Sequence, residues 1–279
     1  AGRAAGSGPG GSAAMTMQPA VEIRDLEKAY PARFSLFGQT RPAVHALKRV
    51  SMAVPAGRTL GIVGESGCGK TTLARCLVGL IRPSGGAIQV EGRPIAELAA
   101  AGPKALGTTV QYVFQDPLSS LNPRKTIRQI LSAPLRFLVG MGAGDREARL
   151  VELMRSVDLE PTFLDRYPHE FSGGQAQRVG IARALAAGAR IIVLDEPVSA
   201  LDVSVQVQVL RLLVDLKRRH GLTYVFISHD LAVVEAIADE VAVMQAGEVV
   251  ETGPPVRLFQ APDHPYTRRL IASVPTLAS

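Results

Sequence analysis

Cysteine is scarce in this chain, which has two cysteines among 279 residues. Cys68 and Cys76 do not have the spacing of a metal-ligand pair, and Cys68 stands inside a glycine-rich segment where a disulfide would obstruct a bound ligand. Neither a disulfide framework nor a cysteine zinc motif fits this pattern. We therefore expect a reduced, cytosolic protein.

Long hydrophobic runs are also missing. The longest run without a charged residue, residues 4–21, is rich in alanine, glycine and serine rather than in large apolar side chains. A membrane-spanning helix and the core of a signal peptide both need contiguous hydrophobic residues. We expect that the chain does not cross a membrane by itself.

Long runs of basic residues are missing as well. The net charge is +6 and the isoelectric point is about 9.6, but the basic residues are dispersed apart from short clusters such as Lys217–Arg219. A nucleic-acid surface could use this charge. We favour a solvated face near anionic lipid or a protein partner, and expect no nucleic-acid partner.

A glycine-rich stretch, Gly64–Thr72, is the strongest signal among the residues that are present. It follows the apolar run 60–63 and precedes the apolar segment 73–81, an order that predicts a strand, a turn and a helix. Glycine, four residues and then Gly-Lys-Thr is the pattern of a phosphate-binding loop. Backbone N–H groups and the following helix N-terminus surround a phosphate in such loops. The sequence therefore predicts a nucleotide site.

Each residue of the loop is expected to contact nucleotide. Lys70 would bridge the β- and γ-phosphates, the Thr71 hydroxyl would coordinate Mg²⁺, and Thr72 would reach an α-phosphate oxygen. The expected contact residues are Gly64, Glu65, Ser66, Gly67, Cys68, Gly69, Lys70, Thr71 and Thr72.

Strand-like apolar runs alternate with helical patterns along most of the chain, which predicts an α/β fold with a largely parallel sheet. The nucleotide would lie at the carboxyl edge of the strands. Residues 202–219 fit a strand or a helix, and their length together with the N-cap position of Asp202 favours a helix. We expect strands at residues 21–24, 44–54, 60–63, 87–90, 109–114, 191–196, 223–228, 241–244 and 248–251.

Three segments are expected along the chain. Residues 1–20 have five glycines in the first eleven positions and no periodicity, and should form a disordered tail. Residues 21–253 should form the nucleotide-binding domain, with an all-helical insertion at about 116–187, and residues 254–279 a short C-terminal extension. Helical spacing within the insertion is clearest at Leu150, Leu153, Met154 and Val157.

Two acidic residues, Asp195 and Glu196, end an apolar strand. Adjacent carboxylates are costly there unless they face a cation and a water molecule. Asp195 fits the acid that orients Mg²⁺, and Glu196 fits the general base that polarises the attacking water.

A second anion-binding helix start is expected at Ser172–Gln175, where small residues precede a helical segment. Taken alone, this motif could also be an ordinary N-cap turn. One chain would therefore carry two phosphate-binding helix starts but a single lysine loop.

These motifs together resemble an ATP-binding-cassette ATPase, and the resemblance covers nearly everything from Val21 to Gly253. It implies a P-loop NTPase core of the RecA-like type, an N-terminal antiparallel β subdomain and an inserted α-helical subdomain. The stretch Phe171–Gln175 is similar to the family signature, with Phe171 in place of the usual leucine.

The resemblance also implies roles for single residues. Gln115 matches the glutamine that senses Mg²⁺ and water, and His229 matches the histidine that contacts the γ-phosphate. Tyr30 falls where the family places an aromatic ring on adenine, although a core tyrosine before a loop is an alternative. The implied residues are Lys70, Gln115, Glu196 and His229 for catalysis; Thr71, Gln115 and Asp195 for the metal; and Tyr30, Gln115, Ser172, Gly173, Gly174, Gln175, Asp202 and His229, besides the phosphate loop, for ATP.

Head-to-tail pairing of two such domains is implied as well. Each ATP would lie between the Lys70 loop of one domain and the Ser172 turn of the other, so that ATP closes the dimer and hydrolysis releases it. The loop Ser199–Asp202 matches the family's dimer contact. Relatives of this type commonly pair two different ATPase subunits, so we expect a heterodimer, and a homodimer stays open.

Two further stretches, Asp116–Arg124 and His264–Leu270, are similar to segments of bacterial oligopeptide, dipeptide and nickel or metallophore importers. This likeness implies two membrane permease subunits, an extracytoplasmic solute-binding protein, and a peripheral position on the cytoplasmic face of the inner membrane. The helical insertion would receive a coupling helix from a permease. The chain stops at Ser279 without a terminal cysteine cluster, so we expect no iron–sulfur centre.

The alternatives are a cassette ATPase of DNA repair or translation and a regulatory subunit that binds ATP without turnover. A repair protein would carry a long heptad insertion or zinc cysteines, and a translation factor two cassettes. A last expectation concerns Cys68: converging N–H groups in the loop should lower the pKa of its thiol.

Overall fold

The computed structural model describes residues 18–31, 33–34, 40–41 and 43–273. Most of the expected tail, residues 1–17, lies outside the described residues. Residues 18–20 do not fit the expectation of a tail, because Ala20 is buried and its carbonyl accepts a hydrogen bond of 2.8 Å from the Glu91 N–H. The packed chain therefore begins before residue 21.

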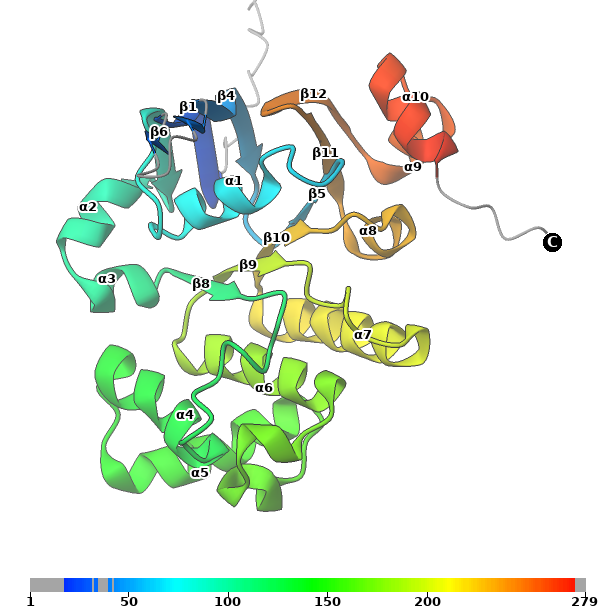
Figure 1. The fold of residues 1–279 in the computed structure, drawn as a ribbon. Coiled ribbons are helices and arrows are strands. Elements are labelled where there is room, and N and C mark those ends of the chain that lie inside the picture. The colour runs from blue at the N-terminus through cyan, green and yellow to red at the C-terminus, as the bar shows by residue number, and fades with distance from the viewer. Residues whose placement is uncertain (1–17, 32, 35–39, 42, 274–279) are drawn as a thin grey trace, which may run out of the picture.

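The N-terminal part forms the antiparallel sheet that the family resemblance implied (Figure 1). Its strand order is β4-β1-β6-β7, with β1 at Val21–Tyr30, β4 at Val44–Val54, β6 at Gly85–Val90 and β7 at Arg93–Pro94. Two short strands, β2 (Arg33–Phe34) and β3 (Thr40–Arg41), pair with each other between the first two expected strands. Strands of two residues are too short to show an alternating pattern, which is why the sequence did not indicate them.

A six-stranded sheet carries the rest of the core, in the order β12-β11-β5-β10-β9-β8. All its pairs are parallel except the antiparallel hairpin of β11 with β12. Every residue of β5, β9 and β10 is buried, as expected for parallel strands covered on both faces. The strands are β5 (Thr59–Val63), β8 (Val110–Val113), β9 (Ile191–Asp195), β10 (Thr223–Ile227), β11 (Glu240–Gln245) and β12 (Glu248–Gly253).

Helices lie on both sides of this sheet (Figure 1). Between residues 116 and 187 the described structure is helical, with no strand. Within the described ranges, no helix has the length and apolar character needed to cross a bilayer. The helices are α1 (Lys70–Leu77), α2 (Ile95–Ala100), α3 (Pro103–Gly107), α4 (Ile127–Pro134), η1 (Leu135–Val139), α5 (Ala143–Ser156), η2 (Pro161–Asp165), η3 (Pro168–Glu170), α6 (Gly173–Ala186), α7 (Val203–His220), α8 (Leu231–Ile237), α9 (Pro255–Gln260) and α10 (Pro265–Ala272).

Two hydrophobic cores hold these layers together. In one core, Leu73 and Leu77 of α1 pack with residues of the antiparallel sheet and with Ile62 of β5. In the other, helices α4 to α8 pack together and against residues of the six-stranded sheet such as Phe226. The carboxyl ends of β5, β9 and β10 are thereby fixed beside one another, which positions the loops that follow them.

Candidate functional site

The phosphate loop connects the buried strand β5 to α1, which begins at Lys70. Gly64, Gly67 and Gly69 have φ values of 151°, 80° and 111°, a region that favours glycine. A Cβ atom on Gly64 would lie 2.2 Å from the Met244 carbonyl oxygen, so this position also needs glycine for its close approach to β11. Strand, turn and helix therefore occur in the predicted order.

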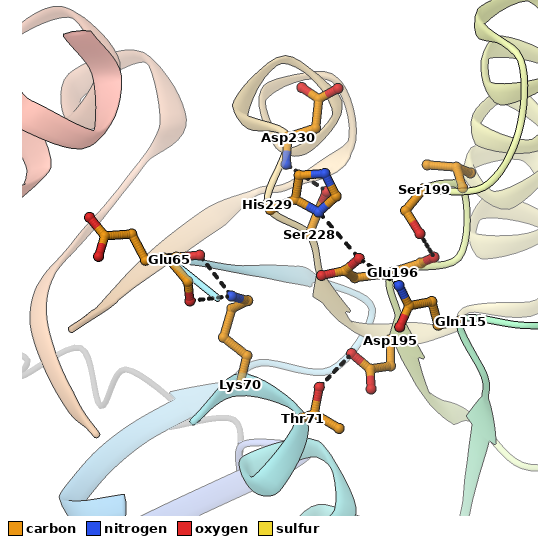
Figure 2. Close-up of polar contacts among 12 residues, drawn as sticks. Glu65, Lys70, Thr71, Gln115, Asp195, Glu196, Ser199, Ser228, His229 and Asp230 are labelled. Carbon is orange, nitrogen blue, oxygen red and sulfur yellow. Dashed lines mark hydrogen bonds and ion pairs between the residues drawn. The ribbon is translucent and has the colours of Figure 1, made fainter. Parts of the chain in front are cut away.

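Lys70 is buried, and its ammonium group lies back over the loop (Figure 2). The Lys70 Nζ donates to the carbonyl oxygens of Gly64 at 2.7 Å and of Glu65 at 2.9 Å. The Glu65 side chain points away from Lys70 (Figure 2), so Glu65 serves the loop through its backbone. The loop carbonyls thus hold the charge of Lys70.

Cys68 differs from the prediction. Burial raises the pKa of its thiol, and this effect outweighs the positive charge of Lys70, whose Nζ lies 3.9 Å from the sulfur. The expectation of a lowered pKa is wrong, although the loop N–H groups act in that direction. The side chain is turned into the core, with 6% of the residue exposed. The free energy lost when a thiolate is removed from water exceeds the stabilisation that the N–H groups and Lys70 give to the negative charge.

The carboxylate of Asp195 lies at the end of β9, beside the first turn of α1 (Figure 2). The Thr71 hydroxyl lies 3.4 Å from one of its oxygens, and the Tyr112 hydroxyl donates to the other at 2.5 Å. Burial and the neighbouring carboxylate raise the pKa of Tyr112, which keeps this donor protonated. Sequence reasoning did not identify Tyr112 as a residue of the site. The one hint in the sequence was that Tyr112 lies in the strand that leads to Gln115.

Glu196, Gln115 and His229 meet at a single carboxylate oxygen (Figure 2). The Gln115 amide donates to the Glu196 Oε2 at 3.1 Å, and the His229 Nδ1 lies 3.2 Å from the same oxygen. Glu196 has a φ of 48°, and its N–H donates to the Ile227 carbonyl at the end of β10. Residues from three strand ends are thereby brought together.

A cavity of about 1110 Å³ lies above the phosphate loop. On the side of the antiparallel sheet it is lined by Tyr30, Val44 and His45. The Tyr30 ring is 38% exposed, and the Lys28 ammonium lies 5.1 Å from its centroid. This volume suits a nucleotide-sized ligand. The predicted residues that line the cavity are Tyr30, Ser66, Gly67, Gly69, Lys70, Thr71, Thr72, Gln115, Glu196 and His229.

The signature residues lie elsewhere. Ser172, the N-cap of α6, forms a capping box with Gln175, and both line a different cavity of about 620 Å³ together with Gly174. Asp202 is the N-cap residue of α7, without a side-chain capping bond. One chain therefore brings together the Lys70 loop and the Glu196 cluster, but it does not bring the signature to them.

The donor set beside the loop fits a magnesium ion. The Thr71 hydroxyl and the Asp195 carboxylate lie side by side. Gln115 lines the same cavity above the phosphate loop as Thr71 does. Hydroxyl, carboxylate and amide oxygens are the hard ligands that Mg²⁺ prefers. The structure thus offers oxygen ligands in the place where the sequence predicted the metal.

A glycine-rich phosphate loop between a parallel strand and a helix, with an acid at the end of the neighbouring strand, defines a P-loop NTPase. The ABC transporter family model matches residues 47–199. The chain belongs to the ABC transporter family, as its motifs predicted.

Similar proteins agree with this assignment. The oligopeptide transport ATP-binding protein AppF of Bacillus subtilis (strain 168) is 46% identical over 94% of this chain and 80% of its own length. The glutathione import ATP-binding protein GsiA of Escherichia coli (strain K12) is 46% identical over 92% of this chain, which spans only 41% of that protein. The dimeric, post-hydrolysis structure of the ATP-binding cassette MJ0796 bound to ADP and Pi is 29% identical, with a TM-score of 0.74 over 84% of this chain and 98% of that one.

Proposed function

We propose that this chain is the ATP-hydrolysing subunit of an importer for peptides or related small solutes, such as oligopeptides, dipeptides or nickel complexes. One observation carries the proposal: the Glu196 carboxylate, held by Gln115 and His229, faces the same cavity as the Lys70 loop. The transport names of AppF and GsiA support the choice of solute class.

The chain's own groups divide the work of hydrolysis between them. Lys70 exchanges its loop carbonyls for the β- and γ-phosphate oxygens, so its charge moves onto the developing negative charge. Glu196 accepts the proton of the attacking water. Gln115 and His229 orient that carboxylate, and His229 contacts the γ-phosphate once ATP is bound. Tyr30 stacks on the adenine ring at the rim of the cavity.

Magnesium is held by Thr71, Asp195 and Gln115 in this proposal. When bound, the ion neutralises charge on the β- and γ-phosphates. Asp195 is kept ready for this role because the Tyr112 hydroxyl fixes one of its oxygens while the other faces Thr71.

A second ATPase subunit completes the site. The residues Ser172–Gln175 line a cavity separate from the one above Lys70, so they serve the nucleotide of a partner rather than that of their own chain. In a head-to-tail pair, the nucleotide above the Lys70 loop of one subunit faces the Ser172–Gln175 segment of the other. Asp202 then lies beside the shared interface. We propose a heterodimer, in line with the pairing common among such importers.

The remaining partners lie in and beyond the membrane. Two permease subunits bind the helical segment after Gln115, and a solute-binding protein delivers the cargo to them from outside. Phe114 and Leu118, both exposed by about 40%, offer apolar surface at this segment. The chain itself lies on the cytoplasmic face of the inner membrane.

The substitution Glu196→Gln tests the catalytic assignment. It keeps the size of the side chain and removes the proton acceptor. The purified transporter should lose at least about a hundredfold in kcat for ATP hydrolysis. ATP affinity, measured by equilibrium binding, should stay close to that of the wild type.

Glu235→Gln, on the exposed face of α8, is the matched control and should leave hydrolysis unchanged. Full ATPase activity in the Glu196→Gln transporter would disprove the role of Glu196. A wild-type transporter in which this subunit's site never turns over would instead favour a regulatory subunit.

The substitution Ser120→Cys tests the permease partner. In membranes that hold the intact transporter, a cysteine in this segment should cross-link to a cytoplasmic loop of a permease. A cysteine at Ser273, the exposed C-cap residue of α10, should not, because α10 lies far from α4 and α5 (Figure 1). If neither position, or both equally, gives a permease adduct on denaturing gels, the proposed docking segment is wrong.

A further inference from the structure

The C-terminal helix α10 contacts the phosphate loop. Tyr266, the second residue of α10, is 3% exposed, and its hydroxyl accepts a hydrogen bond of 3.0 Å from the Glu65 N–H. The two residues are 201 positions apart in the chain. In Figure 1, α10 lies beside α9, on the side of the molecule where β12 forms the edge of the six-stranded sheet. The sequence stretch His264–Leu270 thus has a structural role that neither hydrolysis nor transport explains.

The bond acts on one peptide unit that also holds Lys70. The carbonyl of the Gly64–Glu65 peptide accepts from the Lys70 Nζ at 2.7 Å, while the N–H of the same peptide donates to Tyr266. A peptide unit is planar, so fixing the direction of its N–H also fixes the direction of its carbonyl. Tyr266 and Lys70 therefore hold the entrance of the loop from opposite edges.

Tyr266 is itself firmly placed by the turn before α10. His264 caps the helix through its Nδ1, which accepts from the Tyr266 N–H at 3.2 Å. The Glu251 carboxylate of β12 accepts from the N–H groups of Asp263 at 2.8 Å and His264 at 3.1 Å. Burial alone would raise the pKa of Glu251, but the neighbouring donors, Thr267 and these two N–H groups among them, hold it below its usual value. The helix start is thus fixed to the edge of the sheet.

The loop is also held from the sides of β11 and β4, since Gly69 packs closely on the Ala46 carbonyl of β4. The Gly247 N–H donates to the Cys68 carbonyl at 2.9 Å, and Gly64 packs closely on the Met244 carbonyl. These contacts fix the middle of the loop and its first residue. They leave the orientation of the peptide that follows Gly64 to Lys70 on the carbonyl side and to Tyr266 on the N–H side.

We propose that Tyr266 is a positioning residue of the nucleotide site: its hydroxyl orients the Gly64–Glu65 peptide, and the C-terminal helix thereby presets the phosphate loop for nucleotide. The residue touches no phosphate, since it does not line the cavity above the loop. A preorganised loop binds nucleotide more tightly, because binding then costs less conformational entropy of the loop. The proposal concerns nucleotide affinity of the full chain and does not depend on solute or permease.

The experiment compares two substitutions that each remove one buried hydroxyl. Tyr266→Phe removes the acceptor of the Glu65 N–H. Tyr224→Phe is the matched control, because the Tyr224 side chain is also buried and its hydroxyl donates to the Leu213 carbonyl, away from the loop. ADP affinity by titration calorimetry, exchange of the Glu65 amide by NMR and Tm are measured for each full-length chain.

Tyr266→Phe should weaken ADP binding by roughly two- to tenfold, the loss of one hydrogen bond, and should accelerate exchange of the Glu65 amide. Tyr224→Phe should lower Tm and leave both other readouts unchanged. Unchanged ADP affinity or unchanged exchange in Tyr266→Phe would overturn the proposal. An equal loss of affinity in Tyr224→Phe would also overturn it, since the effect would then come from lost stability.

Discussion

Two tyrosine hydroxyls support the phosphate loop from different elements. Tyr112 donates to the acid that the loop's Thr71 faces, and Tyr266 accepts from the loop's second residue. Their partners are 83 and 201 positions away in the chain, so no motif of contiguous residues contains either pair. The sequence predicted groups for contact with nucleotide, but it did not predict the side chains that hold those groups in place.

Cys68 shows how burial decides chemistry at a single residue. Its raised pKa leaves less thiolate near neutral pH than an exposed cysteine has. We expect iodoacetamide to alkylate Cys68 at least roughly tenfold more slowly than an exposed cysteine introduced at Ser273, as measured by mass spectrometry of the folded chain. Unfolding in urea should remove the difference. Comparable rates in the folded protein would contradict the burial of this thiol.

Helices α6 and α7 meet at a glycine of the signature. A Cβ atom on Gly174 would lie 2.4 Å from a methyl group of Val205, in the first turn of α7. Valine has few rotamers and cannot easily withdraw. A small residue is therefore needed here for the packing of two helix starts, besides any contact with phosphate.

The substitution Gly174→Ala should lower the free energy of unfolding by about 1–3 kcal/mol because it overpacks this contact. Val205→Ala in the same chain should recover part of the loss, since it removes the clashing methyl groups. Urea unfolding of the two single variants and the double variant measures the coupling. Additive effects of the two substitutions would show that the helix starts do not meet as described.

The same helix also resolves an ambiguity of the sequence. The alternating valines of residues 203–209 fit a strand, yet α7 is helical and buries Val209, Leu212, Leu213 and Leu216. Val203 and Val207 are 75% and 42% exposed, so they fall outside the buried stripe. The helical pattern of residues 209–216 decides the structure of this segment, because a helix buries more apolar surface here than a strand formed by the alternating valines would.

Distant parts of the molecule are joined through the carboxylate of Asp239. It accepts from the Thr59 N–H at 2.7 Å, from the Lys217 ammonium at 2.8 Å and from Arg58 at 3.1 Å. These bonds link the start of β5 with α7 and with the segment before β11. Burial would raise the pKa of Asp239, but the three donors hold it below its usual range.

This network makes stability depend on pH. The folded-state pKa of Asp239 lies below the unfolded value of 3.8, so the carboxylate stabilises the fold above that pH, and its contribution is lost as pH falls through the folded pKa. Asp239→Asn should lower the free energy of unfolding by about 1–2 kcal/mol at pH 7. The difference from wild type should shrink below about pH 4.

Urea unfolding across this pH range measures the effect. Asp215→Asn, exposed on α7, is the control and should show no such pH dependence. A wild-type advantage over Asp239→Asn that stays constant down to pH 3 would rule out the linkage.

The sequence by itself determined the family and the α/β fold with its helical insertion, and it predicted the chemistry of the phosphate loop and of the two acids at the end of β9. Contiguous residues suffice for these features, because local backbone geometry and periodic burial are set within a few turns or strands. Only the tertiary structure decided that Tyr266 reaches Glu65, that Cys68 is too buried to ionise readily, and that the signature opens into a cavity of its own. Such outcomes depend on how whole layers pack, which no single stretch of residues specifies.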